Sequence, residues 1–198
     1  MAIPIPPEVL LRAYRQGAFP MAVMPGDIRW FSPQQRGILP LEDFHVPHGT
    51  RRAVNDAAWE VRVDTVFGEV MRACAKRRDT WIDGVIMESY GQLHVTGHAH
   101  SVEVWRDGEL AGGLYGVSIG GAFFGESMFH RVTNASKVAL VWLVRILRAG
   151  GFRLLDTQWT TEHLAQFGAV EVARAQYLRM LAAAIDAPAD FRWPLPPE

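Results

Sequence analysis

The sequence is poor in the features that would direct it to a membrane or an oxidising compartment. It has 198 residues and a single cysteine, Cys74, which excludes an internal disulfide and any multi-cysteine zinc or iron–sulfur site. Its longest apolar run, residues 138–144, is far shorter than the ~20 residues that a bilayer-spanning helix needs. The first residues lack the basic start and continuous apolar core of a signal peptide. We therefore expect a cytoplasmic protein with no membrane contact.

Basic charge is scarce for a protein that binds nucleic acid. The 20 Lys and Arg residues face 21 Asp and Glu residues, whereas proteins dominated by phosphate contacts usually carry a basic domain. The basic residues that do cluster are mainly arginines, whose planar guanidinium can grip a phosphate bidentately. These clusters predict either phosphate contacts or ordinary solvated helix faces, and they comprise Arg51, Arg52, Lys76, Arg77 and Arg78.

Nucleotide-binding motifs are missing. Neither G-x-G-x-x-G nor G-x-x-x-x-G-K-[ST] occurs, which argues against the usual dinucleotide and P-loop sites. Glycine is nevertheless dense between residues 108 and 125. Because glycine weakens a strand interior, this density predicts bulges or the close approach of a ligand or another backbone. A strongly twisted sheet without a ligand is the alternative.

Three histidines lie close together, at His94, His98 and His100. Histidine clusters can bind metal, but here the first two fit one helix face while the third begins a strand. No nearby carboxylate completes a ligand set. We expect a hydrogen-bonded structural turn and no bound metal.

The pattern of apolar residues, caps and turns predicts an α+β fold rather than a doubly wound sheet. The clearest signal is a hairpin around Asp107-Gly108, because this pair suits a two-residue turn. A helix over 135–149, capped by Thr133 or Asn134, is apolar on nearly every side and should be buried. Thr65 should cap another helix. The expected helices are 6–17, 51–57, 65–77, 84–96, 135–149, 161–167 and 174–185; the expected strands are 28–31, 37–41, 61–63, 100–105, 109–119, 122–129 and 152–156, followed by a tail at 193–198.

Two carboxylates occupy unusual positions in predicted strands. Glu126 lies inside the apolar run FFGESMF, where an ionised carboxylate is costly unless it is paired or faces a cleft. Asp156 stands at the exit of FRLLD, and Gln158 would point to the same side two residues later. The two carboxylates predict an anionic cleft, or else each supports a loop. Trp81 and Tyr90 add aromatic surface, which serves either as core or as a platform for unpaired bases.

Several strings, in matching order and spacing over nearly the whole chain, resemble the bacterial leucyl/phenylalanyl-tRNA-protein transferase family. They are AYRQGAFPM, WFSP, TWI (80–82), GHAHSVEVW (97–105), GGLYGV (112–117), FFGESMF (123–129), NASK (134–137) and LLDTQ (154–158). The resemblance implies an acetyltransferase-like (GNAT) domain over residues 61–198 and a small N-terminal α/β portion over 1–60. It also implies the activity: transfer of Leu or Phe from aminoacyl-tRNA to the α-amine of proteins that begin with Arg or Lys, which marks them for degradation. No cofactor is implied.

The resemblance also assigns residues by position. Trp81 and Tyr90 match positions near the terminal adenosine of the tRNA, Phe123 and Glu126 match positions at the aminoacyl site, and Asp156 and Gln158 match the pair tied to acceptor recognition and catalysis. Residues matching the side-chain pocket are Leu114, Met128, Leu143 and Leu147. Some members have Trp where Met21 stands and Phe at 143 and 147, so the preference among Leu, Phe and Met stays open. The two arginine clusters would contact the acceptor end of the tRNA.

An aminoacyl ester is already activated, so such an enzyme needs no nucleophile of its own and must chiefly position a neutral amine and stabilise the oxyanion. Asp156, oriented by Gln158 or acting through it, is expected to attract the cationic N-terminus and accept its proton. The alternative is that the 2'-hydroxyl of the tRNA relays the proton.

Two other functions compete with this one. An acyl-CoA-dependent N-acetyltransferase would share the fold, but it needs a turn of the R/Q-x-x-G-x-G/A kind, and RVTNAS has neither glycine. A non-catalytic tRNA-binding module is the third hypothesis. The presence of Glu126, Asp156 and Gln158 together argues against it.

Overall fold

The computed structural model describes residues 3–77 and 79–195. The strands are β1 (Phe19–Met24), β2 (Asp27–Phe31), β3 (Gln35–Ile38), β4 (Glu60–Val63), β5 (Ala99–Arg106), β6 (Glu109–Ile119), β7 (Ala122–His130), β8 (Leu154–Gln158) and β9 (Val170–Ala173). The helices are α1 (Pro7–Arg15), α2 (His48–Val54), α3 (Phe67–Ala75), α4 (Gly84–Val95), α5 (Ala135–Ala149), α6 (Glu162–Ala165) and α7 (Arg174–Ile185).

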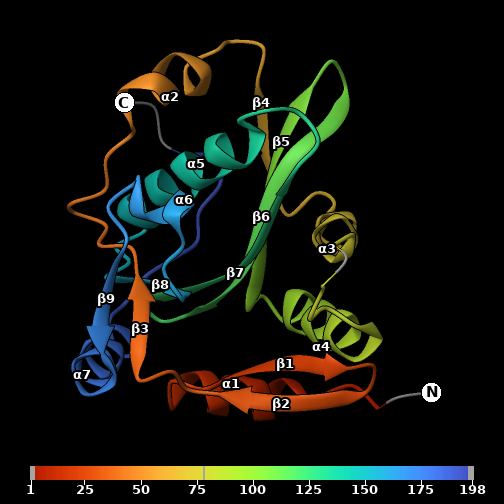
Figure 1. The fold of residues 1–198 in the computed structure, drawn as a ribbon, viewed down its shortest axis with the longest axis vertical. Helices are drawn as coiled ribbons and strands as arrows, with labels where there is room; N and C mark the ends of the chain where they lie inside the picture. The colour runs from red at the N-terminus through yellow and green to blue at the C-terminus, as the bar shows by residue number, and fades with distance from the viewer. Residues whose placement is uncertain (1–2, 78, 196–198) are drawn as a thin grey trace.

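A seven-stranded sheet with the order β4-β5-β6-β7-β8-β3-β9 runs through the centre of the molecule (Figure 1). Its neighbouring strands are antiparallel except for the parallel pair β7–β8. Helices α1, α3, α4 and α7 supply one hydrophobic core, and α2, α5 and α6 supply a second, so the sheet is covered on both faces. The predicted α+β class is confirmed, and so are the Asp107-Gly108 hairpin and the buried helix over 135–149.

Two strands were not expected from the sequence. β1 begins with Phe-Pro and forms a separate two-stranded sheet with β2, while β9 is a short and largely exposed edge strand. β1 is apolar throughout, and β9 alternates over only three residues, Val170, Glu171 and Val172, whereas the alternation that predicts a half-buried strand runs over four or more. β1 is held by pairing with the adjacent β2, and β9 by pairing with β3, which lies far away in the sequence.

One expected helix cap, Thr65, is wrong, and the other, Asn134 as the N-cap of α5, is confirmed in position only. Thr65 donates instead to Glu103, and α3 begins at Phe67. Asn134 adopts a left-handed φ of 71°, and its side chain makes no capping hydrogen bond with any described residue.

β3, formed by residues 35–38, lies between β8 and β9 inside the main sheet. Residues 35–38 belong to the stretch expected to form the N-terminal portion. What lies apart from the main sheet is α1 and the β1–β2 hairpin, at the bottom of Figure 1.

The glycine-rich stretch permits close packing at two places. A Cβ atom on Gly112 would lie 2.6 Å from the Cβ of Ala135, at the start of α5. A Cβ atom on Gly116 would lie 2.3 Å from the carbonyl oxygen of Phe124 on the neighbouring strand. Both distances are shorter than van der Waals contact, so the backbones approach each other because these side chains are absent.

The end of the chain is not a free tail as far as the structure describes it. The ring of Trp193 packs edge-on against Trp142 of α5, and Leu195 contacts the same core. Phe191 stacks on both His100 and Phe123. Residues 196–198 lie outside the described residues.

The histidine cluster forms a hydrogen-bonded turn, as expected. His94 Nδ1 lies 2.8 Å from the carbonyl oxygen of Ala99, and His100 Nδ1 lies 2.7 Å from Asp64 Oδ2. Over residues 3–77 and 79–195, no helix is long and apolar enough to cross a membrane.

Candidate active site

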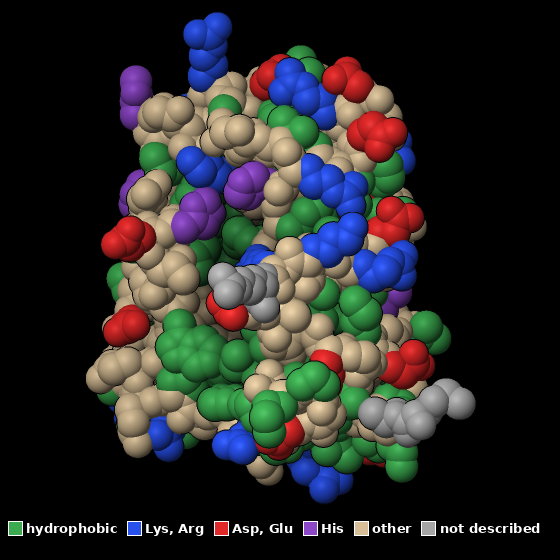
Figure 2. All heavy atoms as spheres, turned by 45° about the vertical axis from the view of Figure 1, so that its right-hand side comes forward, with side chains coloured by type: hydrophobic (Ala, Val, Ile, Leu, Met, Phe, Trp, Pro, Cys, Tyr) green, Lys and Arg blue, Asp and Glu red, His purple; other side chains and the backbone are tan. Residues whose placement is uncertain are grey.

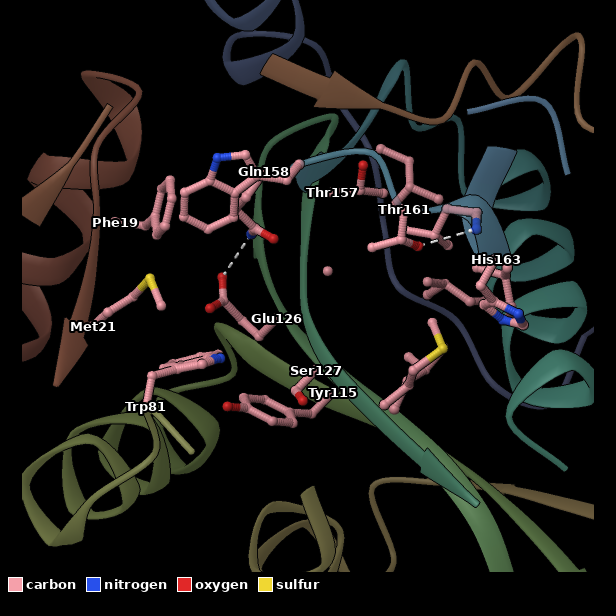
Figure 3. A pocket seen from close by; sticks show the side chains of 18 of the residues that line it. Phe19, Met21, Trp81, Tyr115, Glu126, Ser127, Thr157, Gln158, Thr161 and His163 are labelled. Atoms are coloured by element: carbon pink, nitrogen blue, oxygen red, sulfur yellow. Dashed lines mark hydrogen bonds between the residues drawn. The ribbon is translucent and has the colours of Figure 1, made fainter. Parts of the chain in front are cut away.

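The site lies where the two parallel strands at the middle of the sheet separate. β7 and β8 pair from Ala122–Leu154 to Phe124–Asp156, after which β7 continues beside β6 and β8 turns to β3. The carboxyl ends of parallel strands are common binding sites because no neighbour fills the gap between them. A cavity of about 560 Å³ opens here, and Glu126 and Gln158 lie side by side in it, joined by a hydrogen bond (Figure 3).

Glu126 is aimed into this cavity by a β-bulge. Tyr115 pairs with Ser127 and Gly116 with Gly125, so Glu126 is an extra residue opposite β6. The bulge shifts the alternation of β7 by one, and Phe124 and Phe129 therefore reach the same core although five positions separate them. Bulges next to active sites often redirect one side chain in this way.

The Glu126 carboxylate is surrounded by donors. Tyr14 donates to Oε1 at 2.7 Å, Tyr90 donates to Oε2 at 3.3 Å, and Gln158 Nε2 donates to Oε1 at 3.3 Å. Burial raises the pKa of Glu126 to about 8, against the opposing effect of the tyrosine hydrogen bonds. This carboxyl group therefore titrates near neutral pH at the floor of a cavity, which is a common property of acid–base groups in enzymes.

Asp156 does not face the cleft, and the prediction that its charge does so is wrong. Its side chain is fully buried. Arg36 Nε donates to Oδ1 at 2.9 Å and Arg36 Nη2 to Oδ2 at 2.7 Å, while the Tyr177 hydroxyl donates to Oδ2 at 2.6 Å. An ionised carboxylate inside a sheet needs such partners, and the tertiary structure supplies them from β3 and α7.

Gln158 links the two carboxylates. Its backbone N–H donates to Asp156 Oδ1 at 2.8 Å, and its side chain reaches Glu126. Gln158 has a left-handed φ of 57°. On β3, Gly37 pairs with Gln158 and Ile38 with Asp156, so Thr157 is a second bulged residue. These two irregularities turn Gln158 into the cavity while Asp156 stays buried.

The remaining walls of the cavity differ in chemistry. One end is aliphatic and lies against α5 and α6, with Leu114, Met128, Leu140, Leu143, Leu155 and Leu164. The other end is mainly aromatic, with Phe19, Met21, Trp81 and Trp159. Figure 3 shows Phe19, Met21 and Trp81 on one side of the Glu126–Gln158 pair and Thr161 and His163 on the other. A ligand with an apolar side chain at one end and a flat aromatic ring at the other would fit such a cavity.

Comparison with known proteins decides the family. Residues 38–182 match the model of the leucyl/phenylalanyl-tRNA protein transferase family, and residues 4–34 match the model of its N-terminal domain. A leucyl/phenylalanyl-tRNA–protein transferase from Salinibacter ruber is 54% identical over 190 residues, covering 96% of this chain and 84% of that relative. One from Paramagnetospirillum magneticum is 56% identical over 196 residues, covering 96% and 92%.

The chain belongs to the leucyl/phenylalanyl-tRNA protein transferase family. It is therefore an aminoacyltransferase. Among solved structures, a GCN5-related N-acetyltransferase-like protein from Streptococcus suis resembles the chain with a TM-score of 0.40 and 14% identity, covering 70% of this chain and 57% of that one. A resemblance at this level does not assign an activity.

The residues that this transferase family suggests for substrate binding fall into two groups. Trp81, Leu114, Met128 and Leu143 line the cavity. Tyr90, Phe123 and Leu147 are fully buried behind it. Phe123 stacks on Phe191, and Tyr90 reaches the site only through its hydroxyl on Glu126, so neither offers a free ring to a base.

The arginine clusters of this transferase lie apart from each other. Arg77 lines the cavity and donates to the carbonyl oxygen of Met128, with the exposed Lys76 beside it. Arg51 and Arg52 are exposed on α2, which contributes no residue to the cavity wall. Arg78 lies outside the described residues. On the face shown in Figure 2, basic and histidine side chains gather in the upper half around a hollow with hydrophobic side chains inside.

Sequence reasoning missed three polar residues of this site: Tyr14, Arg36 and Tyr177. Each is fully buried and hydrogen-bonded to Glu126 or Asp156. Arg36 also lies over the rings of Phe19 and Tyr177, with its guanidinium carbon 4.6 Å from each ring centre. The sequence contained one sign of Arg36, an arginine just before the predicted strand 37–41, in QRGI. That pattern is equally typical of an exposed edge strand.

Proposed function

We propose that this protein transfers a leucyl or phenylalanyl group from aminoacyl-tRNA to the α-amine of proteins that begin with Arg or Lys. The product carries a new N-terminal residue and is thereby marked for degradation. One observation supports this most directly: a single cavity has an aliphatic end, an aromatic end, and a glutamate and a glutamine between them. Aminoacyl-tRNA is charged in the cytoplasm, and we propose that the enzyme acts there.

The aliphatic end is suited to the side chain of the transferred amino acid. Leu114, Met128 and Leu143 come from β6, β7 and α5, and together they form an apolar wall on the α5 side of the sheet. Apolar pockets discriminate by shape and only by about 1–3 kcal/mol per methylene, so this end of the cavity accepts Leu or Phe and does not strongly reject Met. Leu at 143 leaves more room than Phe would.

The aromatic end is suited to the terminal adenosine of the tRNA. Trp81 offers a partly exposed ring on the cavity wall, and stacking of an unpaired base on such a ring contributes about 1–3 kcal/mol. Arg77 at the same cavity, together with Lys76, would contact the phosphates that follow. Arg51 and Arg52 would contact phosphates farther along the acceptor stem.

Glu126 and Gln158 are suited to the acceptor amine. Among the described residues that line the cavity, Glu126 is the sole carboxylate, and it lies beside the amide of Gln158. The reaction consumes an activated ester, so it requires positioning and proton transfer rather than a protein nucleophile. We expect no metal or cofactor.

The test is transfer of labelled amino acid from separately charged Leu-, Phe- and Met-tRNA to a peptide that begins with Arg. We expect transfer of Leu and Phe without ATP, coenzyme A or metal, and none to a matched peptide that begins with Asp. Acetylation of the peptide from acetyl-CoA would favour the N-acetyltransferase. Binding of charged tRNA without any turnover would favour the non-catalytic module.

A further inference from the structure

Glu126 belongs to a closed group of three buried hydroxyl and carboxyl groups. Tyr14 comes from α1, Tyr90 from α4 and Glu126 from β7. The Tyr14 hydroxyl bonds to Glu126 Oε1, the Tyr90 hydroxyl bonds to Glu126 Oε2, and the two hydroxyls bond to each other. Each member thus contacts both of the others, and the three contacts form a ring.

The number of hydrogens in this ring depends on the charge of Glu126. An ionised carboxylate only accepts, so the two tyrosines provide two hydrogens for three contacts, and one contact has none. A neutral carboxylic acid brings a third hydrogen. Tyr14 can then donate to Oε1, the acid can donate from Oε2 to Tyr90, and Tyr90 can donate to Tyr14. Every contact is satisfied only in this form, and an unsatisfied polar contact is costly where Tyr14 and Tyr90 are fully buried.

Burial and the charge of Asp156 act in the same direction, whereas the tyrosine hydrogen bonds and Arg36 oppose them. The titratable or charged groups that face Glu126 are Tyr14, Tyr90, Tyr115 of β6, Arg36 of β3 and Asp156 of β8. Arg36 is paired with Asp156, so it offsets that charge more than it favours an ionised Glu126. Burial is the largest influence, and it raises the pKa of Glu126 to about 8.

We propose that Glu126 carries a proton in the resting enzyme and that, with Tyr14 and Tyr90, it moves the proton during aminoacyl transfer. Asp156 is then a positioning residue, which acts through the backbone N–H of Gln158. This inference rests on the proposed function, because it names the acid–base group of that reaction. It replaces Asp156 as the expected proton acceptor.

The step balances without any further reagent. The neutral amine of the acceptor attacks the ester carbonyl, a C–N bond forms, and the amine nitrogen loses one proton to Glu126 Oε2. Oε2 passes its own proton to Tyr90, Tyr90 passes one to Tyr14, and Tyr14 passes one to Oε1. Oε1 gives that proton to the 3'-oxygen of the ribose as the C–O bond breaks. The carboxyl group ends as neutral as it began, so no charge accumulates at the cavity floor, and the products are the amide and the free tRNA hydroxyl.

The first experiment needs no tRNA, so it separates this inference from the proposed function. Infrared difference spectra of the full chain between pH 6 and pH 10 should show a protonated carboxylic acid that titrates near pH 8 and is absent in Glu126→Gln. Tyr90→Phe should shift this band, because the acid loses its acceptor. Tyr177→Phe is the matched control: it removes a buried hydroxyl from Asp156 instead and should leave the band in place.

The second experiment measures single-turnover transfer at saturating charged tRNA and peptide, with a control for ester hydrolysis without enzyme. We expect the rate to fall by roughly 10²- to 10⁴-fold in Glu126→Gln and to decline above about pH 8 in the wild type. An acid band that survives in folded Glu126→Gln, or that is unaltered in Tyr90→Phe, would overturn the inference. If the wild-type protein shows the acid band but folded Glu126→Gln transfers at the wild-type rate, the catalytic role is overturned.

Discussion

Arg36 donates hydrogen bonds from both Nε and Nη2 to Asp156, which lies 120 residues later in the chain, and 1% or less of either side chain is exposed. The ion pair joins β3 to β8 directly beneath Gln158. Asp156 also accepts a hydrogen bond from the Tyr177 hydroxyl, and Arg36 Nη1 donates to the carbonyl oxygen of Gly17 at 3.0 Å. These contacts therefore tie the turn between α1 and β1, the main sheet and α7 to one face of the cavity.

Arg36→Met should destabilise the fold strongly. Removing one partner of a buried ion pair leaves an uncompensated charge, which typically costs about 3–5 kcal/mol. Urea unfolding of Arg36→Met and of the double variant Arg36→Met/Asp156→Asn measures the effect. The double variant should recover part of the loss, since it leaves no buried charge unpaired. Equal stability of the single variant and the wild type would contradict this account.

Asp156→Asn should lower stability and the transfer rate, and it should move the fall in rate at high pH to a lower pH, because the charge of Asp156 helps to raise the pKa of Glu126. Asp156 contacts Arg36, Tyr177 and the backbone of Gln158, but it does not line the cavity. The pH profile should instead follow Glu126, whose pKa is raised to about 8 by burial. A group with a raised pKa keeps its proton up to that pH, so activity that needs the acid form is lost as the pH rises through about 8. A transfer rate that no longer depends on pH in Asp156→Asn would restore this residue as the proton acceptor.

Leu143→Phe should shift the preference from Phe-tRNA towards Leu-tRNA. Leu143 lines the aliphatic end of the cavity, so a larger ring there removes space for the substrate side chain. The expected change in the ratio of kcat/KM values is about 10-fold or more, in keeping with other apolar pockets. Leu147→Met is the matched control on the same helix, because Leu147 is buried outside the cavity wall. If both variants change the ratio equally, the effect is one of helix packing.

Arg77→Glu should raise KM for charged tRNA and reduce the salt dependence of binding by about one unit of slope. Arg77 is exposed and lines the cavity. Arg179→Glu on α7 is the matched control, because Arg179 is exposed, does not line the cavity and has no proposed contact with tRNA. An unchanged KM and salt slope for Arg77→Glu would show that this part of the cluster is only a solvated surface.

Cys74 should resist alkylation in the folded protein. It is buried in α3, and burial raises the pKa of its thiol to about 12, so very little reactive thiolate exists at pH 8. Iodoacetamide should label it slowly under native conditions and quickly in urea. Fast native labelling would show that α3 opens readily.

Local pattern was sufficient for most of the helices and strands. The Asp107-Gly108 turn and the all-apolar stretch of α5 each contain their own structural signal, and both were predicted from neighbouring residues alone. β1 and β9 contain no such signal, because they depend on pairing with β2 and β3. Thr65 shows the same limit: a capping hydroxyl accepts a backbone N–H, but here Glu103 on a distant strand accepts the Val66 N–H, and the Thr65 hydroxyl donates to the same carboxylate.

The sequence by itself determined the fold class, the family to which the chain belongs, and two polar residues of the cavity, Glu126 and Gln158. Only the tertiary structure decided which carboxylate faces the cavity. Two bulges, at Glu126 and Thr157, turn Glu126 and Gln158 into the cavity, and Arg36 and Tyr177 hold Asp156 below it. Strand periodicity is a local property, whereas a bulge and a buried ion pair are set by the neighbouring strand and by side chains far away in the chain.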